Sequence, residues 1–180
     1  GLAYYAEVPV VIWDVQRVGP STGMPTRTAQ GDLTMVNFIS HGDTQMIILI
    51  PGSINECFEF GWKAFDIAER IQTPVVVLSD LDFGMNQWVT PKFEYPNTPM
   101  DRGKILWEAD LDAKIKEGNG KWGRYLDIDG DGIPYRTLPG NSDPRSGYFA
   151  RGTSHDEFAR YTESPEIWER VFKRIEKKFE

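Results

Sequence analysis

Residues 45–80 decide the fold, because two apolar runs, Gln45-Met46-Ile47-Ile48-Leu49-Ile50 and Val75-Val76-Val77-Leu78, enclose a segment of helical character. The helix is predicted to begin at Ser53-Ile54-Asn55-Glu56, where the serine and the glutamate have the spacing of a capping box. It is predicted to end before Thr73-Pro74, since the residue that precedes a proline disfavours the helical region. Strands that are apolar throughout are typical of a parallel sheet covered on both faces.

The chain on either side of this unit extends the same pattern. Glu7–Trp13 is a third apolar run, and we predict a buried strand there that ends at Asp14. A strand, helix and strand in succession imply a right-handed crossover, so the predicted fold class is α/β with a parallel sheet. The chain is expected to divide into a part formed by residues 1–90 and an extension formed by residues 91–180.

The extension is predicted to contain little regular structure. Three prolines within Thr90–Met100 indicate a surface loop, and Gly103–Glu117 has room for one short helix. The glycine-rich stretch Gly118–Gly152 is expected to consist mostly of turns. A closing helix is predicted to start at Thr162-Glu163-Ser164-Pro165, which places a proline in its first turn.

The composition excludes several classes of protein. The chain has 180 residues with 40% hydrophobic residues and a formal charge of -7, which argues against binding to nucleic acid or to anionic membrane surfaces. Its apolar runs are far shorter than the roughly 20 residues that cross a bilayer. Cys57 is the only cysteine, so a disulfide or a cluster held by several cysteines of this chain is excluded, and a reducing, cytoplasmic location is expected. Gly1 is not an initiator methionine, so the chain is expected to be incomplete at its N-terminus.

The segment from Asp14 to Thr26 is the strongest candidate for a binding site. It follows a predicted strand, and open α/β sheets bind ligands beyond the carboxyl ends of their strands. An arginine offers a planar fork of donors to a carboxylate or phosphate, glycines let backbone N–H groups approach an anion, and hydroxyl groups add further donors. The candidate anion-binding residues are Arg17, Gly19, Ser21, Thr22 and Gly23. From chemistry alone, an ordinary surface turn with an exposed arginine remains an equal alternative.

A second candidate is the acidic segment Asp127–Gly132, whose carboxylates alternate as in the opening of a calcium loop (Asp127, Asp129, Asp131). The glutamate that would close such a loop is missing, since Leu138 occupies that position. We therefore favour a tight acidic turn over a metal site. His41 and His155 each have carboxylates nearby in the sequence, but residues that make ordinary hydrogen bonds in turns are the simpler interpretation.

The segment Gly1–Leu33, with its Gln16-Arg17-Val18-Gly19-Pro20-Ser21-Thr22-Gly23 core, resembles the alpha subunit of 2-oxoacid:ferredoxin oxidoreductases. The resemblance covers nearly the whole chain and is greatest to the 2-oxoglutarate branch. It continues through five further segments: Ser40–Asp43, Ala64–Glu69, Pro74–Asp80, Asp131–Gly140 and Glu163–Glu166 at the start of the closing helix.

The resemblance implies a thiamine diphosphate-binding fold and an enzyme that converts a 2-oxoacid and CoA to acyl-CoA and CO2 while it reduces ferredoxin. The alpha subunit would supply the pyrimidine side of the cofactor site, and a beta subunit the diphosphate side, its Mg²⁺ and an iron–sulfur cluster. Arg17 would engage the 2-oxoacid carboxylate or the phosphates of CoA, with Ser21 and Thr22 in support.

The resemblance also implies what this chain lacks. The family's substrate-binding Tyr-Pro-Ile-Thr-Pro segment and its cofactor-activating glutamate lie upstream, and neither is found in these residues. The chain is therefore expected to be the second half of the cofactor-binding domain with an extension toward a next domain, without a catalytic residue of its own and inactive when isolated. Two other hypotheses stay open: a calcium-binding module built around Asp127–Asp131, and a structural subunit whose loop only packs against a partner.

Overall fold

A computed structural model describes all residues, 1–180, which form two compact units. The sheet unit consists of Gly1 and Pro9–Asp101, and the turn-rich unit consists of Leu2–Val8 and Arg102–Glu180. Compact packing alone does not define a domain boundary, so the expected division after residue 90 stays a prediction. No helix of the chain combines the length and the apolar character that a membrane crossing requires.

A four-stranded sheet in the order β2-β1-β4-β3 forms the centre of the sheet unit. Its strands are β1 (Val10–Val18), β2 (Met24–Thr28), β3 (Ile47–Leu49) and β4 (Pro74–Asp80). Strands β1 and β3 both pair with β4 in parallel, whereas β2 is antiparallel to β1. The predicted α/β fold with a parallel sheet is confirmed.

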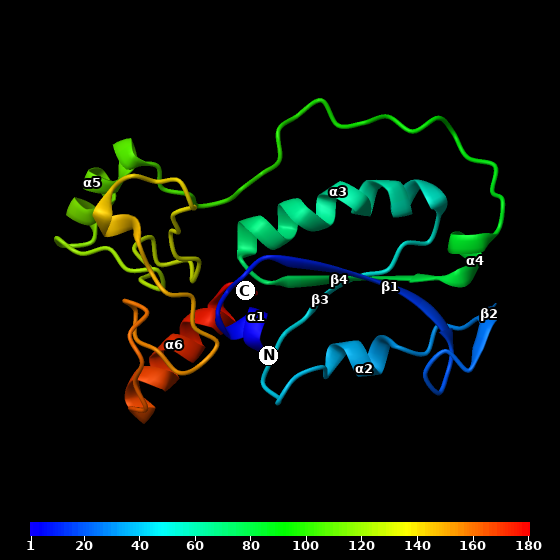
Figure 1. The fold of residues 1–180 in the computed structure, drawn as a ribbon, viewed down its shortest axis with the longest axis horizontal. Helices are drawn as coiled ribbons and strands as arrows, with labels where there is room; N and C mark the ends of the chain where they lie inside the picture. Colours follow the sequence, from blue (N-terminus) through cyan, green and yellow to red (C-terminus); the bar gives the residue numbers. More distant parts are fainter. The chain divides into compact units, whose positions relative to one another are not determined.

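Helix α3 (Ile54–Ile71) covers one face of this sheet (Figure 1). Its N-terminus is as predicted, because the Ser53 hydroxyl accepts a hydrogen bond from the Glu56 N–H at 3.2 Å. The Glu56 carboxylate returns to the N–H of Gly52, one residue earlier than in a standard capping box. Ala64 and Ala68 are fully buried against β4, which explains why small residues occur there.

Helix α2 (Leu33–Asn37) covers part of the opposite face, where Val36 packs against Val76 and Leu78 (Figure 1). Helix α4 (Leu81–Met85) follows β4 directly and is capped by Asp80, whose carboxylate accepts from the Phe83 N–H. Neither helix was predicted, because five residues are too few to establish a helical repeat of apolar positions. The expected loop from Thr90 to Met100 is confirmed.

The first predicted strand differs from the observed one at its end. We expected it to stop at Asp14, but β1 continues to Val18. The continuation is possible because β4 pairs with β1 as far as Gln16 and β2 pairs with Arg17 and Val18. Ladder hydrogen bonds to both neighbours compensate for the polar side chains in this stretch. Arg17 therefore lies inside the strand and not in the loop beyond it.

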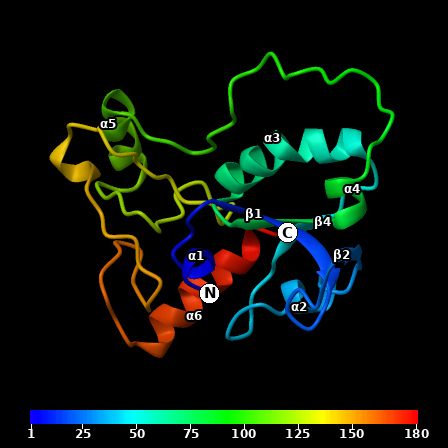
Figure 2. The ribbon, with the colours of Figure 1, turned by 45° about the vertical axis from the view of Figure 1, so that its right-hand side comes forward.

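The turn-rich unit contains α1 (Leu2–Tyr5), α5 (Glu108–Glu117), the 3-10 helix η1 (Pro144–Ser146) and α6 (Pro165–Lys177). Helix α5, the turns and the closing helix α6 were predicted, whereas α1 and η1 were not. Ser164 caps α6 by accepting from the Ile167 N–H. Helices α1 and α6 lie side by side (Figure 2), and Tyr4 packs there with Val171 and Ile175.

A buried ionic cluster ties the N-terminal segment to α6 within this unit. Glu7 is fully buried, and its carboxylate pairs with Arg174 and Lys178, while Arg124 donates to the Glu7 carbonyl at 2.7 Å. Burial would raise the pKa of Glu7, but Lys178 and Arg174 outweigh that effect and lower it to about 2. Burial lowers the pKa of Lys178 to about 8.

Candidate functional site

The predicted anion-binding residues lie on one hairpin at the end of β1. Arg17 is the penultimate residue of β1, and the connection to β2 contains Gly19, Ser21, Thr22 and Gly23. The pairing register of the two strands shifts between Arg17 and Val18, so the hairpin is irregular there. Glycine is favoured at position 23 by the close approach of the backbone, because an added Cβ would lie 3.1 Å from the Pro20 carbonyl oxygen.

The Arg17 guanidinium is held by the hairpin itself. Its Nε donates to the Pro25 carbonyl at 3.1 Å, and its Nη1 donates to the Val15 carbonyl at 3.1 Å. Nη2 has no partner within the chain. The two bonds fix the plane of the group and leave one amino group for a ligand, which is the arrangement that an arginine needs to recognise an anion.

The other predicted residues share the turn but not a hydrogen-bond network. Ser21 and Thr22 are exposed, and neither bonds to Arg17. Ser21 has a positive φ of 55°, a conformation that ordinary residues seldom adopt. The structure therefore places Arg17, Ser21 and Thr22 on one hairpin without a hydrogen bond between their side chains, and their roles in binding stay predictions.

Two glutamines attach the base of this hairpin to β4, and sequence reasoning missed both. Gln16 is 4% exposed; its amide donates to the Ser79 carbonyl at 3.2 Å and accepts from the Asp32 N–H at 3.0 Å. Gln30 donates to the Asp80 carboxylate at 2.7 Å. The available signal was Gln16 itself, a polar residue at an inward position of a sheet strand, where it must find buried partners.

A pair of carboxylates lies next to the same hairpin. Burial raises the pKa of Asp14, and the neighbouring Asp32 raises it further by its charge and by a hydrogen bond between the two side chains. Asp32 precedes α2 but makes no side-chain cap there. The pair adds no positive potential and so leaves the recognition of an anion to Arg17.

The acidic turn has an internal counter-ion. Lys104 binds Asp129 at 2.8 Å and Asp131 at 2.7 Å, while the Asp127 carboxylate accepts the N–H groups of Gly130 and Gly132. Although burial acts in the opposite direction, the hydrogen bonds from Lys104 lower the pKa of Asp129 and Asp131. No three His, Cys, Asp or Glu side chains are arranged so that they could hold a metal ion. The arrangement is that of a closed ionic turn.

Neither histidine nor the single cysteine belongs to the Arg17 hairpin or to the acidic turn. His155 is fully buried, stacks on Tyr125 with 3.8 Å between ring centroids, and has a pKa that burial lowers. His41 is exposed. Cys57 lies on α3 and is half-buried, and burial raises the pKa of its thiol, with Asp80 and Glu56 adding to the effect. A thiol kept protonated in this way is a poor metal ligand.

Comparison with known proteins gives consistent results. The sequence profile of the family described as "Pyruvate flavodoxin/ferredoxin oxidoreductase, thiamine diP-bdg" matches residues 1–101. Subunit alpha of 2-oxoacid:ferredoxin oxidoreductase 2 from Aeropyrum pernix is 37% identical over 180 residues, which are 99% of this chain and 26% of that relative. The 2-oxoglutarate synthase subunit KorA from Methanothermobacter marburgensis is 51% identical over 80 residues, 44% of this chain and 21% of that subunit.

A solved structure is also similar to nearly the whole chain. It is the 2-oxoglutarate:ferredoxin oxidoreductase from Magnetococcus marinus with 2-oxoglutarate, coenzyme A and succinyl-CoA bound, and it is 30% identical with a TM-score of 0.84. The match covers 99% of this chain and 29% of that chain. The present chain thus spans about a quarter of the length of the full-length relatives that it matches.

Proposed function

Since the chain belongs to the thiamine diphosphate-binding family of pyruvate flavodoxin/ferredoxin oxidoreductases, we propose that it is part of the alpha subunit of a 2-oxoglutarate-type 2-oxoacid:ferredoxin oxidoreductase. The assembled enzyme would convert a 2-oxoacid, CoA and two oxidised ferredoxins to acyl-CoA, CO2, a proton and two reduced ferredoxins. The choice of 2-oxoglutarate is supported by the matches to KorA subunits and by the similar solved enzyme.

The observation that carries the proposal is the Arg17 guanidinium, clamped by two backbone carbonyls with Nη2 free. Both 2-oxoacids and CoA are anions, and a fixed guanidinium binds a carboxylate or a phosphate without having to be ordered first. Its place at the carboxyl end of β1 is where α/β sheets bind their ligands. In the proposed enzyme, Arg17 binds and orients an anionic group of the substrate, and Gly19, Ser21, Thr22 and Gly23 shape the turn around it.

Thiamine diphosphate is the cofactor that the family implies, and the chain does not fit its diphosphate end. Mg²⁺ at that end needs one or two carboxylates beside the phosphates, but the acidic turn of this chain already pairs with Lys104 through Asp129 and Asp131. The free donor at the hairpin suits an anionic substrate. We therefore propose that the diphosphate and Mg²⁺ are held by a beta subunit, and no step of the reaction is assigned to a group on this chain.

The same reasoning applies to electron transfer. Iron–sulfur clusters are held by several cysteine thiolates, whereas this chain has Cys57 alone. We therefore propose that the electrons pass through a cluster outside these residues, on a partner chain, before they reach ferredoxin.

The test is an assay of the purified, assembled enzyme that contains this chain. With 2-oxoglutarate, CoA and oxidised ferredoxin, we expect CoA-dependent reduction of ferredoxin and formation of succinyl-CoA, at a higher kcat/KM than with pyruvate. A preference for pyruvate would reject the 2-oxoglutarate assignment. Failure of every 2-oxoacid to reduce ferredoxin would reject the proposed function.

A further inference from the structure

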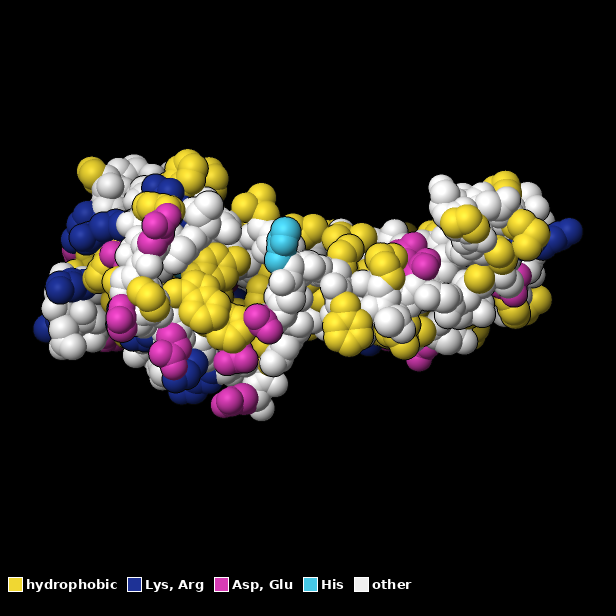
Figure 3. All heavy atoms as spheres, turned by 90° about the horizontal axis from the view of Figure 1, so that it is seen from below, with side chains coloured by type: hydrophobic (Ala, Val, Ile, Leu, Met, Phe, Trp, Pro, Cys, Tyr) yellow, Lys and Arg dark blue, Asp and Glu magenta, His cyan; other side chains and the backbone are white.

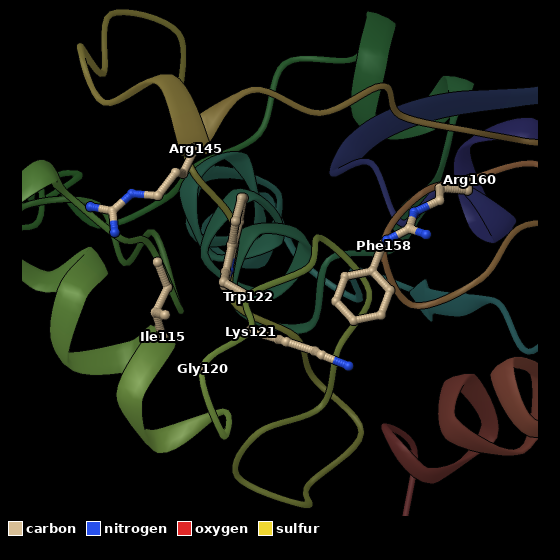
Figure 4. A pocket seen from close by; sticks show the side chains of 7 residues that line it. All are labelled: Ile115, Gly120, Lys121, Trp122, Arg145, Phe158 and Arg160. Carbon is tan, nitrogen blue, oxygen red and sulfur yellow. The ribbon is translucent and has the colours of Figure 1, made fainter.

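A pocket of about 430 Å³ in the turn-rich unit has no part in the function proposed above. Ile115 of α5, the turn Gly120–Trp122, Arg145 of η1, Phe158 and Arg160 line it (Figure 4). Its volume lies within the usual range for small-molecule sites. Three of its seven lining residues are cationic and none is acidic, on a chain whose net charge is -7. The charge of the lining therefore favours an anionic ligand.

Two of the cations flank an aromatic ring. The Lys121 Nζ lies 5.9 Å and the Arg160 Cζ 5.1 Å from the centroid of Phe158, and Figure 4 shows both side chains extending beside that ring. The Lys121 ammonium forms no ion pair or hydrogen bond within the chain. Arg160 reaches only Asp156, at 4.0 Å, and that carboxylate also accepts two backbone N–H groups. Both cations thus keep donors for a ligand.

The third cation has a different role. Arg145 is held by Asp143 through two hydrogen bonds of 2.9 and 2.6 Å and also by Asp112 at 2.8 Å. These carboxylates balance its charge and fix its position, so Arg145 forms a rigid wall. The anion-binding capacity of the pocket therefore rests on Lys121 and Arg160.

Trp122 supplies a second aromatic surface and an unused donor. Its indole Nε1 is buried and has no acceptor in the structure, although buried donors in proteins are normally paired. The ring lines the pocket and meets Tyr148 edge-on, with 6.3 Å between centroids. Because this N–H group is shielded from the pocket, the ring is what Trp122 offers to a ligand.

We propose that this pocket binds a planar ring that carries a phosphate, of the size of a mononucleotide. The ring would contact Trp122 and Phe158, and Lys121 and Arg160 would supply the positive charge for the phosphate. Aromatic side chains next to free cations recognise such a ligand by stacking and by charge together. The site uses no residue of the Arg17 hairpin.

The test measures the binding of AMP to the assembled enzyme by calorimetry, with adenosine and inorganic phosphate as separate probes. We expect AMP to bind at least about tenfold more tightly than either probe, since each probe lacks one half of the recognition. The Lys121→Gln/Arg160→Gln double variant should weaken AMP binding about tenfold or more, and Trp122→Leu, which removes the aromatic ring, should weaken it several-fold or more.

Lys173→Gln is the matched control, because Lys173 is an exposed cation of α6 that pairs with Glu169 and does not line the pocket. It should leave AMP binding unchanged. AMP binding that is unaltered in the double variant, or inorganic phosphate that binds as tightly as AMP, would overturn the proposal. Absence of saturable AMP binding to an enzyme with a normal melting temperature would overturn it as well.

Discussion

Arg17 illustrates how a single residue acquires a function from its immediate backbone. The sequence indicated an arginine next to a glycine-rich turn, and the structure adds that two carbonyl groups of the same hairpin hold the guanidinium in place. A lysine at this position keeps the charge but can neither bridge both carbonyls nor present a second fixed donor. The planar group is therefore the feature to test.

Arg17→Lys in the assembled enzyme should raise the KM for the 2-oxoacid or for CoA by about tenfold or more, since one charge-assisted hydrogen bond is lost. Steady-state kinetics with each substrate varied in turn will show which anion Arg17 binds. Arg27→Lys, on exposed strand β2, is the control and should leave both constants unchanged. Unaltered kinetics in Arg17→Lys would remove Arg17 from the site.

The buried cluster of Glu7, Arg174 and Lys178 should make the stability of the folded chain depend on pH. The pKa of Lys178 is lowered to about 8 in the folded chain. Between this value and the ordinary pKa of lysine the unfolded state binds more protons, so stability rises with pH over that window. For Glu7, whose folded pKa is lowered to about 2, the stabilising contribution is present above the ordinary pKa of glutamate and is lost as the pH falls toward 2.

Lys178→Met should therefore flatten the increase in melting temperature of the assembled enzyme between about pH 8 and pH 10. Glu7→Gln should lower the stability at neutral pH by about 3–5 kcal/mol, because it leaves two buried cations without their partner. Lys177→Met, at the neighbouring and largely solvated position of α6, is the control. A Lys178→Met curve with the slope of the wild type would show that the cluster is not coupled to stability.

Helices and strands with a long run of regularly spaced apolar residues could be predicted from the sequence, whereas short elements could not. Helices α3 and α6 were located correctly because Ser53 and Ser164 cap apolar stripes of several turns. Strand β2 could not be predicted, since its residues are mostly exposed and it pairs with β1 at two positions only. The predicted end of β1 was wrong for the same reason, because the last two residues of β1 pair with the unpredicted strand β2.

This weak pairing means that the hairpin depends on its attachments to β4. Gln30 bonds to Asp80, which in turn caps α4. Gln30→Glu places a second carboxylate opposite Asp80, and the repulsion should raise the KM for the anion that Arg17 binds several-fold at neutral pH. Gln30→Lys can pair with Asp80 and should restore a KM near that of the wild type.

The kcat of the Gln30→Glu variant should change less than its KM, because the hairpin orients a substrate anion and carries no reacting group. Equal kinetics of the Glu and Lys variants would show that this attachment does not position Arg17. A loss of folding is distinguished from this outcome by the melting temperature of each variant.

For the molecule as a whole, the sequence predicted the layers of the sheet unit but not which apolar side chains stay at the surface. Three apolar strands and one long helix were enough to define the α/β fold. Around α2, however, several large apolar side chains are exposed, among them Met35, Phe38 and Ile39. Figure 3, which views the molecule from the α2 side, shows apolar side chains at the surface. Hydrophobicity alone could not distinguish these residues from core residues.

Because of this exposed apolar surface, we expect the 180-residue chain to aggregate when it is expressed alone and to bind no thiamine diphosphate. Clusters of exposed apolar side chains associate in water unless a partner covers them. Phe38→Ser with Ile39→Ser should therefore reduce the light scattering of the isolated chain. Val89→Ser should not, because Val89 is fully exposed on a loop and its single side chain offers little area for association. A monomer of 20.5 kDa with a cooperative melting transition would contradict the prediction, since the chain would then tolerate its apolar surface without a partner.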